Sequence, residues 1–106
     1  MDLELLTSSH ATRTYSCTFA EGEACFTDHF PEQPVIPGSL LIAVASECIR
    51  GETCAVSPKL IVRKFSFRRF ACPGAYQLRI TREKVNFLCT YSQGTHVVAE
   101  GKLTWS

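Results

Sequence analysis

The sequence lacks the patterns that mark membrane-spanning, secreted or metal-binding proteins. Its apolar runs all fall short of the ~20 residues that a helix needs to cross a bilayer. The six cysteines form no CxxC pair, so we expect reduced thiols that pack as small apolar side chains, without disulfides or metal. The segment Met1–Leu6 is acidic where a secretory signal is basic, which predicts a cytoplasmic protein.

Repeats, low-complexity segments and linkers are missing too, which predicts one domain over residues 1–106. At this length the 45% of apolar residues is enough for a core, and the 20% of charged residues is ordinary for a globular protein. The composition therefore excludes a disordered chain.

The first half of the chain has few basic residues, and the second half has few acidic ones. Residues 1–53 hold eight acidic and two basic side chains, whereas residues 54–106 hold two acidic and nine basic ones. A basic cluster attracts an anionic partner such as a phosphate group or an acidic protein, unless it is only a solvated sheet face. Nucleic acid is the least expected partner, because no helix-turn-helix, zinc or single-strand-binding signature accompanies the cluster.

The hydrophobic pattern predicts one helix among strands. Residues 39–49 are nearly all apolar, which is typical of a helix buried on every side, and Gly51 is its expected stop. Alternating apolar residues predict strands at 12–19, 59–68, 75–82, 85–91 and 95–105, with a short extended piece at 24–27.

One helix followed by four strands predicts an α+β fold in which an antiparallel sheet wraps the helix. The open edges of so small a sheet favour pairing with a second chain.

The most distinctive segment is residues 29–38, His-Phe-Pro-Glu-Gln-Pro-Val-Ile-Pro-Gly, which leads into the predicted helix. Its three prolines restrict the backbone, so His29 lies on a rigid extended loop where its imidazole could transfer protons near neutral pH. Gly38 allows a sharp turn and leaves free N–H groups at the helix start. His10 and His96 have no such surroundings and are expected on the surface.

Asp28-His-Phe-Pro, Pro34-Val-Ile-Pro-Gly and the apolar stretch after them resemble the 3-hydroxyacyl-acyl-carrier-protein dehydratases of fatty acid synthesis, of the FabZ and FabA type. The resemblance covers nearly the whole chain, including the segments Phe65–Phe70, Cys72–Gly74 and Gly94–Thr104. It implies a hotdog fold, a long helix wrapped by an antiparallel sheet, and a dimer with active sites at the subunit interface.

The resemblance also implies catalytic roles. The histidine matching His29 is the base, and the backbone N–H matching Gly38 polarises the thioester carbonyl, for which helix-end amides are preorganised. An acid in the helix of the other subunit helps the 3-hydroxyl to leave as water. That position is Ala43 in this sequence, so the expected carboxylate is missing.

Loss of a positioned acid typically costs ~10²–10⁴ in rate, so another group would have to replace it. Glu47 is the only acid within residues 39–49 and lies one helical turn beyond Ala43, on roughly the same face. It is either the replacement acid or a polar residue near the helix end. Ser46 and Cys48 are weaker candidates.

Binding residues for the substrate and its carrier can be named too. In the family such aromatic side chains can line the acyl tunnel, so the acyl chain is expected against Phe30, Val35, Pro37 and Phe67, although Phe30, Phe65, Phe67 and Phe70 are all more typical of the core. The basic cluster is the expected docking surface for the carrier. The residues expected to dock the acidic carrier protein are Arg63, Lys64, Arg68 and Arg69. No cofactor is expected, because the substrate arrives on the phosphopantetheine of the carrier.

Three functions remain open from the sequence. The first is a FabZ-like dehydratase of fatty acid or polyketide synthesis that removes water from a 3-hydroxyacyl thioester. The second is a catalytically impaired subunit that binds the acyl carrier protein, or completes a heterodimeric dehydratase with a related chain that carries the helix acid. The third is an acyl-thioesterase, because the hotdog fold also hosts that activity.

Overall fold

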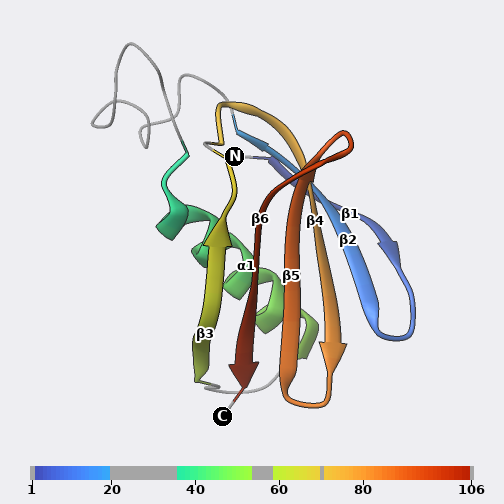
Figure 1. The fold of residues 1–106 in the computed structure, drawn as a ribbon. Coiled ribbons are helices and arrows are strands. Elements are labelled where there is room, and N and C mark those ends of the chain that lie inside the picture. Colours follow the sequence, from blue (N-terminus) through green and yellow to red (C-terminus); the bar gives the residue numbers. More distant parts are fainter. Residues whose placement is uncertain (1, 20–35, 54–58, 70, 106) are drawn as a thin grey trace.

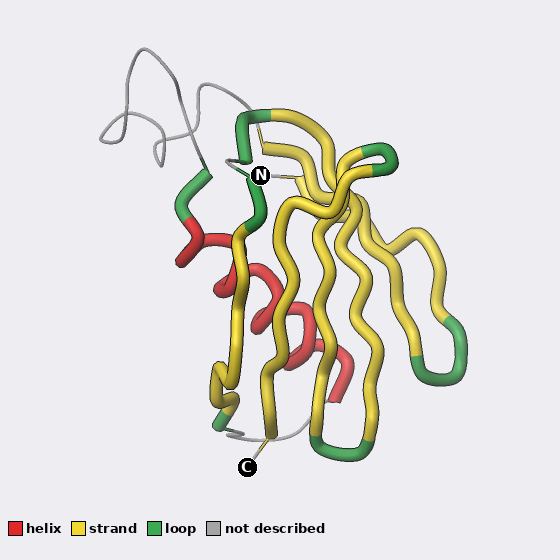
Figure 2. Tube along the Cα trace, in the orientation of Figure 1, coloured by secondary structure: helices red, strands yellow, loops and turns green. Residues whose placement is uncertain are grey.

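The computed structural model describes residues 2–19, 36–53, 59–69 and 71–105. Within them the elements are β1 (Asp2–Ser8), β2 (Thr12–Phe19), α1 (Gly38–Thr53), β3 (Leu60–Phe67), β4 (Gly74–Glu83), β5 (Asn86–Gln93) and β6 (His96–Trp105). The strands form one antiparallel sheet in the order β1-β2-β4-β5-β6-β3. Helix α1 lies against one face of this sheet (Figures 1 and 2), which confirms the predicted α+β arrangement.

The core lies between α1 and the sheet face that it covers. Alternate residues of β4 and β5 point into it, since strand side chains alternate between faces; they include Tyr76, Leu78, Ile80, Phe87, Cys89 and Tyr91, all at most 4% exposed. The Tyr91 hydroxyl donates a hydrogen bond to the carbonyl oxygen of Leu41 at 2.6 Å, which ties β5 to the helix. No polar or charged residue is buried in the described part of the chain.

Most strand predictions agree with the structure to within two residues. The exception is β1, which the sequence did not predict. Its leucines remain exposed at 43–46%, and Leu lacks the β-branched or aromatic character that made the other strands recognisable. Strand β1 extends the sheet beyond β2 by pairing from Asp2 opposite Thr18 to Ser8 opposite Arg13. The piece expected at 24–27 lies outside the described residues.

Two predictions about the helix were wrong. It does not stop at Gly51 but continues to Thr53, and it is not buried on every side. The sheet covers only one side of α1, so Leu41, Val44 and Ile49 are buried while Ala43 and Glu47 are exposed. The near-absence of polar residues in this segment suggested uniform burial, but small alanines tolerate exposure.

The described cysteines Cys17, Cys48, Cys72 and Cys89 are free thiols. Within the described ranges, no three His, Cys, Asp or Glu side chains are grouped so that they could hold a metal ion. No helix in the same part of the chain is both long and apolar enough to cross a membrane. The cytoplasmic location stays a prediction.

Candidate active site at the helix start

A pocket of about 300 Å³ lies where α1 begins. It is mostly apolar, with one guanidinium group, and its lining residues are Ile36, Pro37, Gly38, Leu41, Phe67, Arg69 and Ala71. We call it the helix-start pocket. Two predicted substrate contacts, Pro37 and Phe67, therefore lie together with the predicted carbonyl-binding residue, Gly38.

Backbone hydrogen bonds hold the walls of this pocket together. The Ile36 amide donates to the Ala71 carbonyl at 2.6 Å, which joins the approach to the helix to the segment after β3. On the other side, the Arg68 amide donates to the Val98 carbonyl at 2.9 Å. The end of β3 and the start of α1 are thereby held side by side, although about thirty residues separate them in sequence.

Gly38 is needed here because the Phe67 ring packs directly over it. A Cβ placed on Gly38 would lie 2.7 Å from Phe67 Cζ and 3.0 Å from Cε1, closer than carbon atoms approach. The ring remains 48% exposed and lies 5.4 Å, centroid to centroid, from the ring of Phe65. Phe67 therefore forms a movable wall of the pocket beside the helix start.

The electrostatics of the pocket favour an electron-rich oxygen. No acidic residue lies in the first turn of α1, and the Gly38 and Ser39 amides have no backbone acceptor within the described residues. Free amides at a helix start carry partial positive charge, to which the guanidinium of Arg69 adds a full one. A carbonyl or carboxylate oxygen is the group that such a site attracts.

Ala43 and Glu47 lie on the exposed side of α1 and do not line the helix-start pocket. The Glu47 side chain is 75% exposed and its carboxylate is 3.5 Å from the Arg50 guanidinium. The Ser46 hydroxyl donates to the Ile42 carbonyl at 2.9 Å, and Cys48 is buried. Within one protomer, no described side chain replaces the missing acid at the pocket.

His29, Phe30 and Val35 fall outside the described residues, and so does Phe70. The role of His29 as base therefore stays a prediction from the motif, as do the acyl contacts of Phe30 and Val35. His10 and His96 are exposed, as predicted.

The four basic residues predicted to dock a carrier do not form one cluster. Arg69 lines the helix-start pocket, whereas Arg63 and Lys64 lie on the opposite sheet face. Arg68 donates a hydrogen bond to Glu100 and forms an ion pair with it. Two features explain the division. A bulge between Val62 and Lys64 lets the consecutive residues Arg63 and Lys64 share one face, and alternation beyond Lys64 turns Phe65 and Phe67 to the other face.

Sequence reasoning missed three pocket residues, Ile36, Leu41 and Ala71. Leu41 lies one turn into the helix, so its position next to Gly38 follows once α1 is known to start there. Ala71 carried no signal, because its contact with Ile36 depends on how the segment after β3 returns past the helix.

Burial keeps two ionisable groups of the core, the Cys17 thiol and the Tyr91 phenol, in their neutral forms. Burial raises the pKa of Cys17 to about 11, and it also raises the pKa of Tyr91, next to which lie three cysteine thiols. Because a thiol reacts as the thiolate, a raised pKa leaves Cys17 inert at neutral pH. Cys17 is therefore a core residue and not a candidate nucleophile.

Solved structures with the same architecture define the class of fold. A chain of the dehydratase heterocomplex ApeI:P from Xenorhabdus doucetiae superposes with a TM-score of 0.80 at 18% identity, covering 99% of this chain and 98% of that one. The dehydratase domain of the polyketide PpsC from Mycobacterium tuberculosis gives 0.76 at 14% identity, over 96% of this chain and 42% of that one. A thioesterase from Haemophilus influenzae gives 0.66 at 13% identity, over 98% and 76%. These likenesses confirm the predicted hotdog fold.

The family follows from the sequence match. The ApeI-like family, described as ApeI dehydratase, matches residues 6–102, so this chain belongs to the ApeI-like dehydratase family. Among curated proteins, none matches the chain significantly. The expectation of a hotdog dehydratase is thereby confirmed at the level of the family.

Proposed function

We propose that this chain forms part of a dehydratase that eliminates water from a 3-hydroxyacyl thioester carried by an acyl carrier protein. The observation that carries the proposal is the helix-start pocket, where Gly38 lies among apolar residues and no acid occupies the first helical turn. Membership of a dehydratase family supports the same reaction. The narrower likeness to FabZ and FabA rests on the His-Phe-Pro and Pro-Gly motifs.

In this reaction the Gly38 N–H holds the thioester carbonyl oxygen and withdraws electrons from it, which acidifies the adjacent C–H bond. His29 removes that proton. The electron pair of the broken C–H bond forms the new C=C bond as the neighbouring C–O bond breaks. The departing hydroxyl takes up one proton and leaves as water.

The acid expected to give the hydroxyl its proton is missing from this chain. Ala43 has no carboxylate, so two identical chains would place alanine at both sites. In our proposal an unlike hotdog chain supplies the acid. The structural neighbour described as a dehydratase heterocomplex supports such a pair.

The surface of the chain offers a place for a partner. Strand β3 is a sheet edge among the described strands, and its residues Ile61 and Val62 are 37% and 45% exposed. An open edge with apolar side chains favours pairing with another strand. The exposed side of α1, with Ala43 on it, lies on the same protomer and is open to a partner helix.

The test is to restore the acid within a single chain. Purified protein carrying Ala43→Glu is incubated with 3-hydroxyacyl carrier protein, and the loss of one water is followed by mass spectrometry. We expect the unmodified chain alone to be slow and the variant to gain about 10²-fold or more, the usual contribution of a positioned acid. Gly51→Glu is the matched control, because it places a carboxylate on exposed helix surface away from the pocket.

Three results would count against the proposal. One is a gain from Gly51→Glu as large as that from Ala43→Glu. A second is undiminished water loss when His29→Ala is added to Ala43→Glu. The third is release of free thiol instead of water, which would favour the thioesterase activity of the Haemophilus influenzae neighbour.

A separate measurement tests Glu47 as the acid. Loss of activity in Glu47→Gln without any change in stability would assign the acid to Glu47 and not to an unlike chain.

A further inference from the structure

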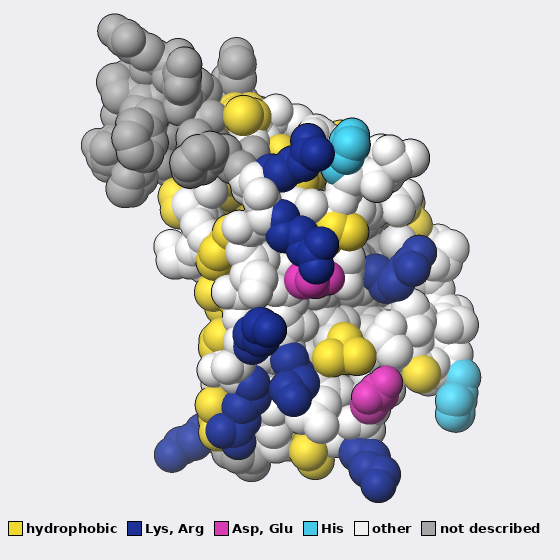
Figure 3. All heavy atoms as spheres, in the orientation of Figure 1, with side chains coloured by type: hydrophobic (Ala, Val, Ile, Leu, Met, Phe, Trp, Pro, Cys, Tyr) yellow, Lys and Arg dark blue, Asp and Glu magenta, His cyan; other side chains and the backbone are white. Residues whose placement is uncertain are grey.

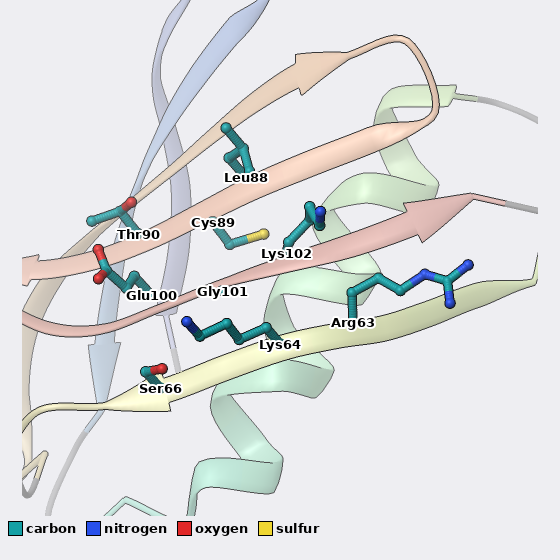
Figure 4. Close-up of a pocket in the computed structure, with 9 residues that line it drawn as sticks. All are labelled: Arg63, Lys64, Ser66, Leu88, Cys89, Thr90, Glu100, Gly101 and Lys102. Atoms are coloured by element: carbon teal, nitrogen blue, oxygen red, sulfur yellow. The ribbon is translucent and has the colours of Figure 1, made fainter.

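A second hollow, of about 460 Å³, lies on the sheet face away from α1. We call it the outer groove. Figure 4 shows side chains from β3, β5 and β6 around it, with the helix behind the strands. Its lining residues are Arg63, Lys64, Ser66, Leu88, Cys89, Thr90, Glu100, Gly101 and Lys102.

The register of the sheet concentrates positive charge in this groove. Lys64 of β3 lies directly opposite Lys102 of β6. Like charges in a directly opposed pair destabilise a sheet. A bulge between Val62 and Lys64 interrupts the alternation beside them, and Arg63 also lines the groove. Three cations thus share one small area, which is unfavourable unless an anionic group comes between them.

The acid in the groove does not cancel this charge. Glu100 is hydrogen-bonded and ion-paired to Arg68, so its negative charge is already matched. Glu100 lies between two uncharged residues, opposite Thr90 of β5 on one side and Ser66 of β3 on the other. The surface view agrees, because Lys and Arg side chains gather on this face (Figure 3).

We propose that the outer groove docks the acidic surface of the acyl carrier protein, a site separate from the helix-start pocket. This inference rests on the proposed function. The groove is open and its cations are exposed, which suits electrostatic docking of a protein surface more than enclosure of a small ion. Leu88 of β5, 38% exposed and opposite Lys102, offers an apolar contact at one side of the groove.

Strand β3 joins the two sites. Its outward residues Lys64 and Ser66 belong to the outer groove, whereas Phe67 and, just beyond the strand, Arg69 belong to the helix-start pocket. The five residue-to-residue steps from Lys64 to Arg69 span about 16 Å of extended chain. A carrier seated on the outer face thus lies near the end of β3, around which its prosthetic arm can reach the pocket while the edge of β3 stays available to a partner chain. Arg69, just beyond that end, is placed to meet the phosphate of the arm.

The test measures binding of the apo carrier protein, which lacks the prosthetic arm and so cannot use the pocket. The test variant is Lys64→Gln with Lys102→Gln. The matched control removes two exposed lysines outside the groove, Lys59→Gln with Lys84→Gln. We expect the test variant to weaken Kd by about tenfold or more at low salt and to flatten its salt dependence, whereas the control changes Kd by less than about twofold.

A second readout is urea unfolding, measured without and with the carrier. Removing the opposed lysines should raise the urea midpoint of unfolding, because their repulsion is relieved, and adding the carrier should raise the midpoint of the unmodified chain but not that of the variant. Equal Kd for the test variant and the unmodified chain would overturn the inference. So would equal weakening by test and control variants, or displacement of the carrier by a short single-stranded oligonucleotide at equal concentration.

The outcomes for the two proposals are separable. Groove-dependent binding without water loss in Ala43→Glu would leave the docking surface standing and remove the dehydratase. The opposite result is water loss by Ala43→Glu with a KM for the 3-hydroxyacyl carrier protein that stays the same when Lys64→Gln and Lys102→Gln are added. It would leave the dehydratase standing and remove the docking surface.

Discussion

The two faces of strand β3 are under different physical constraints. On the inner face, Phe65 and Phe67 pack against two glycines, Gly101 and Gly38, where an added Cβ would lie within 3 Å of the ring. On the outer face, Lys64 lies opposite Lys102 and side-chain volume is not restricted by neighbours. The inner face is therefore controlled by close packing and the outer face by charge, and substitutions of similar size should have different consequences on each.

The largest effect is expected where the packing is tightest. A Cβ on Gly101 would overlap both the Phe65 ring and the backbone carbonyl of Lys64, and backbone cannot move aside easily. Gly101→Ala should lower the free energy of unfolding by about 3 kcal/mol, measured by urea denaturation. Gly51→Ala is the control, because an added Cβ there meets nothing within 4 Å apart from its chain neighbours and the backbone of its own helix, and it should stabilise the helix by about 0.5–1 kcal/mol. An unchanged midpoint for Gly101→Ala would show that β3 is not held closely against β6.

The complete burial of Cys17 of β2 in the core predicts a loss of stability at alkaline pH. The pKa of Cys17 rises from 9.0 to about 11 on burial, so above pH 9 the unfolded chain releases a proton that the folded chain retains. The stability is complete below pH 9 and falls as the pH rises toward 11, by about 2 kcal/mol from this thiol. Tyr91, whose pKa is also raised by burial, adds to the loss.

The pH prediction is checked by urea unfolding at a series of pH values from neutral to alkaline. Cys17→Ala should be less stable than the unmodified chain at neutral pH but should lose less on going to pH 11. Parallel curves for the two proteins would mean that this thiol ionises as easily in the folded chain as in the unfolded one.

The smallest effect is expected at the helix start, where the neighbour can give way. Gly38→Ala brings a methyl group against the tip of Phe67, a half-exposed side chain that can rotate. We expect a loss of about 1 kcal/mol, and Phe67→Ala should cancel most of it in a double-mutant cycle. A coupling energy near zero would separate Phe67 from Gly38 and weaken its assignment to the wall of the helix-start pocket.

Much of the fold could be predicted because its signals are local. Strand β2 was predicted at its observed ends, since Thr, Tyr and Phe alternate through it, and the helix was expected directly after the Pro-Gly pair, where α1 begins at Gly38. Strand β1 could not be predicted, because exposed leucines carry no strand preference and only pairing with β2 orders them.

The candidate site was predictable only in part, because local signals name residues but do not say which face of the sheet they reach. The sequence named Gly38, Pro37 and Phe67, which do lie together. It could not show that Lys64 and Arg69 line different hollows, since that depends on the path of β3 and of the residues after it. The bulge at Arg63, an irregularity of pairing with β6, has no sequence signature here. Lys102 was not predicted as a docking residue, because only the strand register places it opposite Lys64.

Local patterning was sufficient to specify one helix, its glycine start and the strands that follow, since these depend on side-chain period and backbone preference within a few residues. The pairing order β5-β6-β3 and its register arose only on folding, because hydrogen bonds between distant strands set them. That register places a phenylalanine over each of two glycines on one face and opposes two lysines on the other.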